Sequence, residues 1–161
     1  MPDQSPLRNH NLTYREIVTD FQSIVQDNIS VGTFDTGTLD YLDANAVNKV
    51  YPYIYLRPIT SAGVVDRTRG LTFELYSLDV PQLSDESPVG VLSDTEQRIY
   101  QILSYFNQGP TNVQQKYSVE INNISPVNEA FQDRVFGWVA TIDVITPYKW
   151  DYCDYPNATT T

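Results

Sequence analysis

The sequence predicts an α+β fold in which two helices pack on a largely antiparallel, four-stranded sheet, in the order α-β-β-α-β-β. Two segments repeat apolar residues at the three-to-four-residue spacing of a helix face, and four others alternate apolar and polar residues as strands do. The 161 residues are 41% hydrophobic and 19% charged, which is the length and composition of one folded domain. We therefore expect a single domain over residues 1–161, with an extended N-terminal arm at 1–11 and an extended tail at 149–161.

The two predicted helices each begin at a capping box. The first box is Thr13-Tyr-Arg-Glu16, in which each side chain accepts a hydrogen bond from the other residue's backbone amide. Apolar side chains then recur on one face as far as Asn28. The second box is Ser93-Asp-Thr-Glu96, and its helix ends at Gly109-Pro110, because these residues stop helices. The apolar face of the second helix consists of Ile99, Ile102, Leu103 and Phe106.

The first two predicted strands cover residues 50–59 and 71–78 and form an antiparallel hairpin. A wide tip containing two glycines, Gly63 and Gly70, is expected between them. Prolines at both ends of the first strand indicate that it is short or lies at an edge of the sheet, since proline has no N–H to donate to a neighbouring strand.

The other two predicted strands cover residues 117–122 and 134–146. The last strand is apolar on both faces, which predicts a central strand or one covered on both sides. Residues 30–50 are rich in Gly, Thr, Asp and Asn and are expected to form a loop. This loop is longer than most connections inside a domain, so we consider it a candidate contact with a neighbouring molecule.

The sequence has few of the side chains that catalysis or metal binding requires. The single histidine, His10, precedes the first helix, and the single cysteine, Cys153, has no histidine near it in the sequence. Phosphate-binding glycine loops and nucleophile elbows are absent. Two acidic pairs could hold a hard cation such as calcium, although solvated acidic loops are commoner: Asp85 with Glu86, and Asp151 with Asp154. We predict a non-enzymatic protein without a cofactor. An unrecognised hydrolase stays an alternative, because carboxylates from distant segments can meet in a fold.

The net charge of −10 argues against a nucleic-acid-binding surface, since binding phosphates requires clustered Lys and Arg and the chain has ten in total. Apolar runs are too short to span a membrane, and the N-terminus does not resemble a signal peptide, so we expect a soluble protein made in the cytosol. Twelve tyrosines are present, and tyrosine is favoured at protein interfaces, although it also lies at the edges of cores. The composition therefore favours binding to other proteins.

Charge is distributed unevenly along the chain, which suggests where partners bind. Four of the ten basic residues lie between positions 49 and 69, whereas the segment from Asp79 to Glu96 has five acidic residues and no basic one. Segments of opposite charge can pair head-to-tail between identical subunits. The alternative is an attraction within one molecule between solvated loops. The candidate interface residues are Arg57, Arg67, Arg69, Asp79, Asp85 and Glu86.

The predicted order of elements resembles that of the tail-terminator, tail-completion and neck proteins of tailed bacteriophages. These proteins have an N-terminal helix, a β-hairpin with a projecting loop, a second helix and two more strands. Residues 136–156, FGWVATIDVITPYKWDYCDYP, look like the last strand and exit segment of such proteins.

The resemblance implies a structural virion protein that forms a homo-oligomeric ring, commonly a hexamer, assembled in the host cytoplasm. Such a ring caps the tail tube protein and joins it to the head-to-tail connector on the portal side. DNA passes through its lumen without sequence-specific binding, and an acidic subunit suits this passage because it does not grip phosphate. The alternative class is a non-viral adaptor domain that binds proteins.

Overall fold

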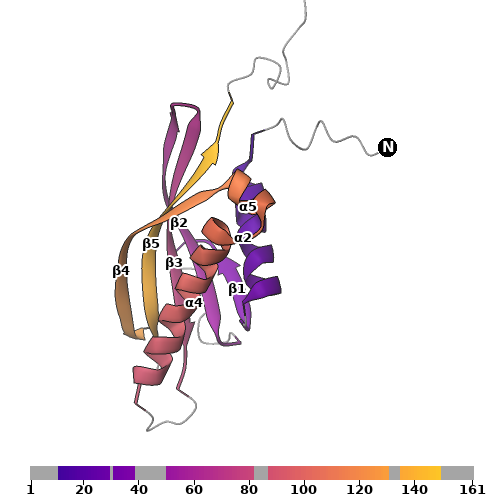
Figure 1. Cartoon of the computed structure of the whole chain (residues 1–161). Coiled ribbons are helices and arrows are strands. Elements are labelled where there is room, and N and C mark those ends of the chain that lie inside the picture. Colours follow the sequence, from indigo (N-terminus) through magenta and orange to yellow (C-terminus); the bar gives the residue numbers. More distant parts are fainter. Residues whose placement is uncertain (1–10, 30, 39–49, 82–86, 131–134, 150–161) are drawn as a thin grey trace, which may run out of the picture.

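The computed structural model describes residues 11–29, 31–38, 50–81, 87–130 and 135–149 (Figure 1). Its five strands form one mixed sheet in the order β1-β2-β3-β5-β4, in which β1 runs parallel to β2 and the other neighbours are antiparallel. The predicted α+β class is therefore confirmed, but the prediction of four strands and two helices is wrong. The elements are α2 (Tyr14–Asn28), β1 (Thr33–Thr36), β2 (Tyr53–Val65), β3 (Thr68–Asp79), α4 (Val89–Gln108), α5 (Thr111–Lys116), β4 (Ser118–Ala130) and β5 (Val135–Pro147).

Helix α2 begins as predicted. The Thr13 hydroxyl accepts a hydrogen bond from the Glu16 amide at 3.2 Å, and the Glu16 carboxylate accepts one from the Thr13 amide at 3.1 Å. Helix α4 instead begins four residues before the predicted box, after Pro88, so Ser93 lies inside the helix. Proline suits the start of a helix, and the buried Val91 extends the apolar face toward this earlier start.

The short strand β1 lies within the segment that was expected to be a loop. It has only four residues, too few for an alternating pattern to stand out, and its partner β2 begins 17 residues later in the chain. Phe34 on this strand is 7% exposed and belongs to the core. Residues 39–49 of the predicted loop lie outside the described residues, as do most of the predicted terminal arm and tail.

The β2–β3 hairpin is longer and tighter than predicted. Strand β2 has 13 residues and lies between β1 and β3, so the prediction of a short or edge strand is wrong for its first half. Gly63 pairs with Gly70 inside the ladder, and the tip is a two-residue turn at Asp66 and Arg67. Beyond Leu56, β2 has no described neighbour on its outer side.

Of the two remaining strands, β4 is longer than predicted and β5 lies close to its predicted bounds. Strand β4 continues to Ala130, well past the predicted end at residue 122. Strand β5 lies between β3 and β4, which confirms the prediction of a central strand.

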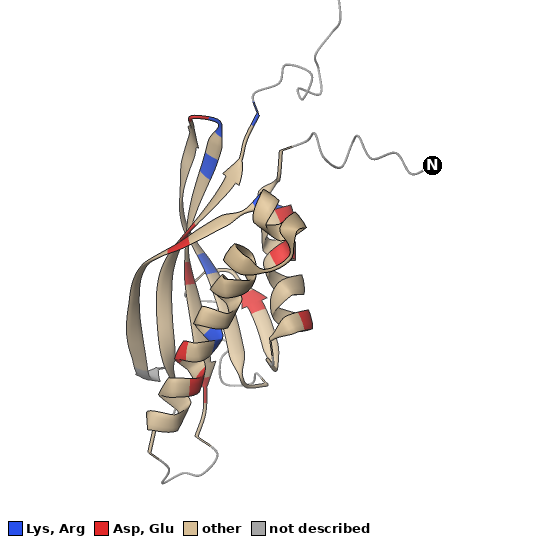
Figure 2. Cartoon of the chain, viewed as in Figure 1, with Lys and Arg blue, Asp and Glu red and all other residues tan. Residues whose placement is uncertain are grey.

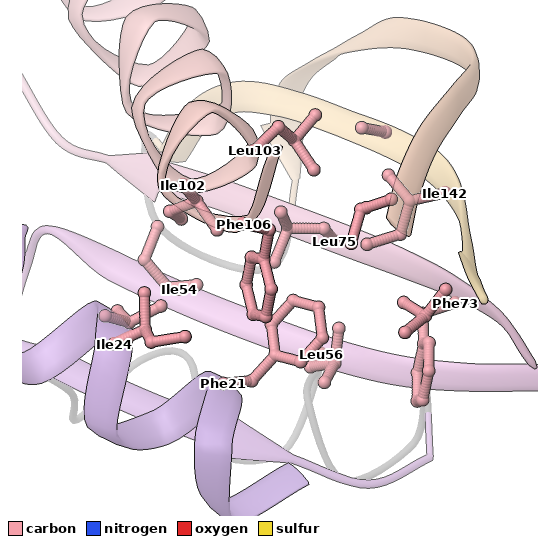
Figure 3. Close-up of a cluster of buried hydrophobic side chains, with 14 of the residues drawn as sticks. Phe21, Ile24, Ile54, Leu56, Phe73, Leu75, Ile102, Leu103, Phe106 and Ile142 are labelled. Atoms are coloured by element: carbon pink, nitrogen blue, oxygen red, sulfur yellow. The ribbon is translucent and has the colours of Figure 1, made fainter. Parts of the chain in front are cut away.

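The helices lie together on one face of the sheet, and the main core lies beneath them (Figure 1). Phe21 of α2 meets Phe106 of α4 with ring centroids 4.3 Å apart, and both side chains are fully buried. Figure 3 shows how the apolar side chains of both helices interlock with those of β2 and β3. Burial of this size fixes the helices to the sheet. On the opposite face, the described residues form no helix.

Candidate interaction site

The hairpin β2–β3 continues beyond the helix layer as a projecting arm, which we define as residues 58–72 (Figure 1). The end of β5 runs alongside it as far as the pair of Thr68 and Pro147. On β2, residues 58–63 and Val65 are exposed. Two of these side chains are large and apolar, with Ile59 44% and Val65 61% exposed. The arm therefore offers an uncovered strand and apolar side chains at one end of the molecule.

The tip of the arm holds two non-glycine residues in left-handed backbone conformations. The φ angles of Asp66 and Arg67 are 50° and 65°. Hairpins with two-residue turns of this type favour Asn-Gly or Asp-Gly, because glycine adopts positive φ without a steric penalty. The turn is held by a hydrogen bond from the Thr68 hydroxyl to the Val65 carbonyl and by one from the Tyr148 amide to the Arg67 carbonyl, both 2.8 Å long. Arg67 is thus held at the exposed tip at some conformational cost.

Arg57 was predicted to bind a neighbouring subunit, but it has a partner within the molecule. Its guanidinium donates to the Glu74 carboxylate across the β2–β3 pair at 2.8 Å, and the Tyr76 hydroxyl donates to the same oxygen at 2.8 Å. Burial, followed by the bond to Glu74, raises the pKa of Tyr76 to about 12. The hydrogen bond to Glu74 is also the main reason why the pKa of Arg57 is raised.

Two other predicted interface residues also have partners within the molecule. The Asp79 carboxylate lies 3.3 Å from the Arg98 guanidinium of α4. Arg69 donates to the Leu12 carbonyl at 3.1 Å and so attaches the segment before α2 to the arm. None of these contacts joins the basic segment 49–69 to the acidic segment 79–96, so they decide neither for pairing between subunits nor for attraction between these segments within one molecule. Asp85 and Glu86 lie outside the described residues.

Arg67 differs from the other predicted basic residues. Its side chain is exposed, and within the part of the chain that the structure describes no carboxylate pairs with it. Figure 2 shows acidic and basic segments side by side at the tip of the arm, where Asp66 precedes Arg67, whereas acidic residues predominate on the body. Of the predicted interface residues that the structure describes, Arg67 is thus the one whose charge is directed at solvent.

The sheet face opposite the helices has two halves. The half next to the arm, called the upper half, is polar, and the half farther from the arm, called the lower half, is apolar. In the upper half the Asp143 carboxylate accepts hydrogen bonds from the Thr72 hydroxyl at 2.6 Å and from the Asn122 amide at 2.8 Å. The lower half holds a second cluster of buried side chains. This cluster consists of Tyr53, Tyr55, Tyr76, Leu78 and Val135. The part of this face next to the arm is therefore the polar one.

The buried tyrosines of the lower half keep their hydroxyls hydrogen-bonded. Tyr53 donates to the Asp35 carboxylate at 3.0 Å, and Tyr55 donates to the Thr38 carbonyl at 2.7 Å. The chain at the end of β1 and just after it therefore lies against this half of the sheet. The sequence predicted a strand over residues 50–59, but it did not predict that Tyr53 and Tyr55 are buried.

The outer edge of β4 was not identified by the sequence. A groove of about 270 Å³ separates this edge from the second half of α4. At its end the Asn107 side chain donates to the Val119 carbonyl at 2.7 Å and accepts from the Val119 amide at 3.0 Å. The groove is lined mainly by Tyr100, Leu103, Ser104, Asn107, Gln108 and Ile121. An asparagine late in a predicted helix could have pointed to such a contact, but asparagine has many other uses in sequences.

Among the described residues, no three His, Cys, Asp or Glu side chains are grouped closely enough to hold a metal ion. His10 and Cys153, the two residues with the most distinctive chemistry, lie outside the described residues. None of the described helices combines the length and apolarity needed to cross a membrane.

Comparison with known proteins gives no family for this chain. No protein-family model matches it, and no curated protein matches its sequence.

Proposed function

We propose that the chain is a ring-forming structural subunit of a phage tail, a tail terminator or neck protein that acts by contact and not by catalysis. The observation that carries the proposal is the arm. Its β2 strand is exposed from residue 58 to residue 63, and its tip presents Arg67 in a backbone conformation that glycine would adopt more easily. Retention of an unfavourable residue at an exposed position suggests a role for its side chain.

The two edges of the sheet support assembly into a ring. One edge is the projecting half of β2, and the other is the outer edge of β4 beside α4. Because these edges have different shapes, a contact between them is heterologous, and repeated heterologous contacts form closed rings when the rotation closes. We propose that six copies close in this way, between the tail tube protein and the connector on the portal side of the virion.

The polar upper half of the open sheet face suits the lumen of such a ring. Glu120 and Asp143 contribute negative charge to this face, and the one basic residue described there, Arg57, is neutralised by Glu74. A surface of this kind repels DNA phosphates and lets DNA pass. Rings of Glu120→Lys should retain DNA at low salt, whereas wild-type rings and rings of Glu96→Lys on the helix side should not. Equal retention by the three proteins would contradict the placement of this face.

Native mass spectrometry over a range of concentrations, together with negative-stain imaging, tests the proposal. Rings of about six subunits are expected for the wild-type chain. Arg67→Glu should reduce the ring fraction, while the matched change Arg15→Glu on the exposed side of α2 should not. A protein that stays monomeric at every concentration would favour the adaptor class instead.

A further inference from the structure

The C-terminal end of α4 carries a partial negative charge that no basic residue in its last turn balances. The last carbonyls of a helix have no partners within it, and the helix dipole places roughly half a negative charge at this end. The Phe106 carbonyl would normally accept from the amide four residues later, but that residue is Pro110, which has no N–H. Residues 99–115 include no charged side chain, and the second half of α4 is accordingly tan in Figure 2. This helix end therefore suits a cation from elsewhere.

The groove between the second half of α4 and the outer edge of β4 lies next to this helix end. Its lining combines Leu103, which is 6% exposed, with Tyr100 and Ile121, which are 44% and 36% exposed. A hydrogen bond with Glu96 raises the pKa of the Tyr100 hydroxyl, so an acidic group lies close to one wall. Apolar walls suit the methylene stem of a long basic side chain, and an aromatic ring attracts its cationic head. The groove thus combines the features that bind an arginine.

Arg67 at the tip of the arm has the chemistry that this groove requires. Its side chain is exposed, and no carboxylate of the described chain pairs with it. By contrast, Arg57 bonds to Glu74, and Arg69 bonds to the Leu12 carbonyl. A guanidinium has five N–H donors in a rigid plane, which can bond to several carbonyl oxygens and stack on a ring. Arg67 is thus the arginine of the arm that is available to the groove.

Arg67 cannot reach the groove of its own molecule. Its carbonyl accepts a hydrogen bond from the Tyr148 amide just past the end of β5, whereas Ile121 beside the groove pairs with Ile142. Six residues of extended chain cover roughly 20 Å. Strand β5 also lies between β3 and β4. Since this separation is far longer than an arginine side chain, a groove that Arg67 fills belongs to a second copy.

We propose that Arg67 of one copy inserts into the groove between α4 and β4 of a second copy, with its guanidinium at the C-terminal end of α4. The contact is made by a side chain at the tip of the arm. It does not require regular pairing of the strand edges, which register shifts interrupt. Because it joins unlike surfaces, each copy keeps a free groove or a free arm until a ring closes. This inference rests on the proposed ring and names the surface that Arg67 contacts.

The test reverses the two charges of the contact. Arg67→Glu brings a carboxylate to the negative end of α4, and Gln108→Lys puts a competing cation into the groove. Each substitution alone should weaken association at least about tenfold. The double variant combines an acidic tip with a basic groove and should recover most of the wild-type association. Native mass spectrometry and sedimentation velocity over a range of concentrations measure the four proteins.

Gln26→Lys is the matched control for the groove substitution. Gln26 is exposed in the last turn of α2, which also has no basic residue. A lysine in the last turn complements the dipole of either helix, so neither lysine variant should lose stability in circular dichroism melting curves. Gln26→Lys should assemble as the wild type does, whereas Gln108→Lys should not.

The outcomes separate this contact from the ring itself. If either single variant assembles as well as the wild type, or if the double variant recovers nothing, the contact is overturned while the ring stays in place. A wild-type chain that is monomeric at every concentration would overturn both.

Photo-crosslinking provides a second measurement that does not depend on charge. Benzoylphenylalanine at position 104, an exposed residue that lines the groove, should cross-link to the tryptic peptide 50–67 of a second copy. A mixture of isotopically light and heavy chains identifies the cross-links between copies. Cross-links between copies that involve only peptides outside the arm would also overturn the contact.

Discussion

Asn107 makes a specific prediction about the edge of β4, because its side chain takes the place of a neighbouring strand. Replacement by alanine removes two hydrogen bonds, to the Val119 amide and to the Val119 carbonyl. At about 0.5–1.5 kcal/mol for each bond, the free energy of unfolding should fall by about 2 kcal/mol. For a chain of this size the melting temperature should then fall by roughly 4–8 °C.

Asn107→Asp distinguishes the amide geometry from a general loss of packing. Its carboxylate can still accept from the Val119 amide, but at neutral pH it faces the Val119 carbonyl, which is also an acceptor. The aspartate variant should therefore be less stable than the alanine variant at pH 7. It should recover part of the difference below about pH 4, where the carboxyl is protonated and can donate.

Urea unfolding curves at pH 7 and pH 3.5 and hydrogen exchange of the Val119 amide measure these effects. Exchange should accelerate in the alanine variant, since its amide is left facing solvent at the sheet edge. If both variants match the wild type in stability, or if the Val119 amide keeps its protection without Asn107, the reasoning is refuted.

Three further predictions concern the tip, the centre and the open face of the sheet. Arg67→Gly should raise the free energy of unfolding by about 1 kcal/mol, because it relieves a positive φ, and should nevertheless reduce the ring fraction in native mass spectrometry. Gly137→Ala should cost about 3 kcal/mol in urea unfolding, since a Cβ atom there would overlap the backbone of β3, whereas Gly90→Ala in open space on α4 should stabilise by about 0.5–1 kcal/mol. The pKa of Tyr76 is raised to about 12 in the folded state, above its unfolded value near 10, so its contribution to stability is complete below pH 10 and is lost as the pH rises toward 12. Tyr76→Phe should make that decline shallower in unfolding curves between pH 9 and pH 12, and an unchanged decline would contradict the assignment.

The parts of the fold that the sequence predicts are those determined by local residues. The capping box at Thr13, the stop at Gly109 and the alternation in β3 and β5 each depend on a few neighbouring residues, and each appears in the structure at or near its predicted position. Strand β1 depends on a partner 20 residues away, and four residues give no reliable period. Its bracketing by Gly32 and Gly37 was the available signal, but glycines also mark loops.

The start of α4 shows how a correct rule can be applied at the wrong place. Ser93 and Glu96 have the spacing of a capping box, yet here both lie inside the helix, with Ser93 exposed and Glu96 half-buried. The hydroxyl of nearby Thr95 donates to the Val91 carbonyl at 2.7 Å, which is the bond it makes when the helix has already begun. The helix can continue toward the N-terminus at little cost, so the apolar residues of its amphipathic face do not determine at which residue the helix begins.

Charge pattern did not distinguish which of the predicted interface residues have partners within the molecule. A run of like charges in the sequence does not reveal which residues form ion pairs in the fold. Arg57 pairs with Glu74 across two strands, and Asp79 pairs with Arg98 of α4. What separates Arg67 from them is backbone conformation, which no charge count includes. A hairpin selected for stability alone would have glycine at this second turn position. The chain keeps an exposed arginine there, beside an uncharged strand edge, and this combination is the reason to expect a partner at the tip of the arm.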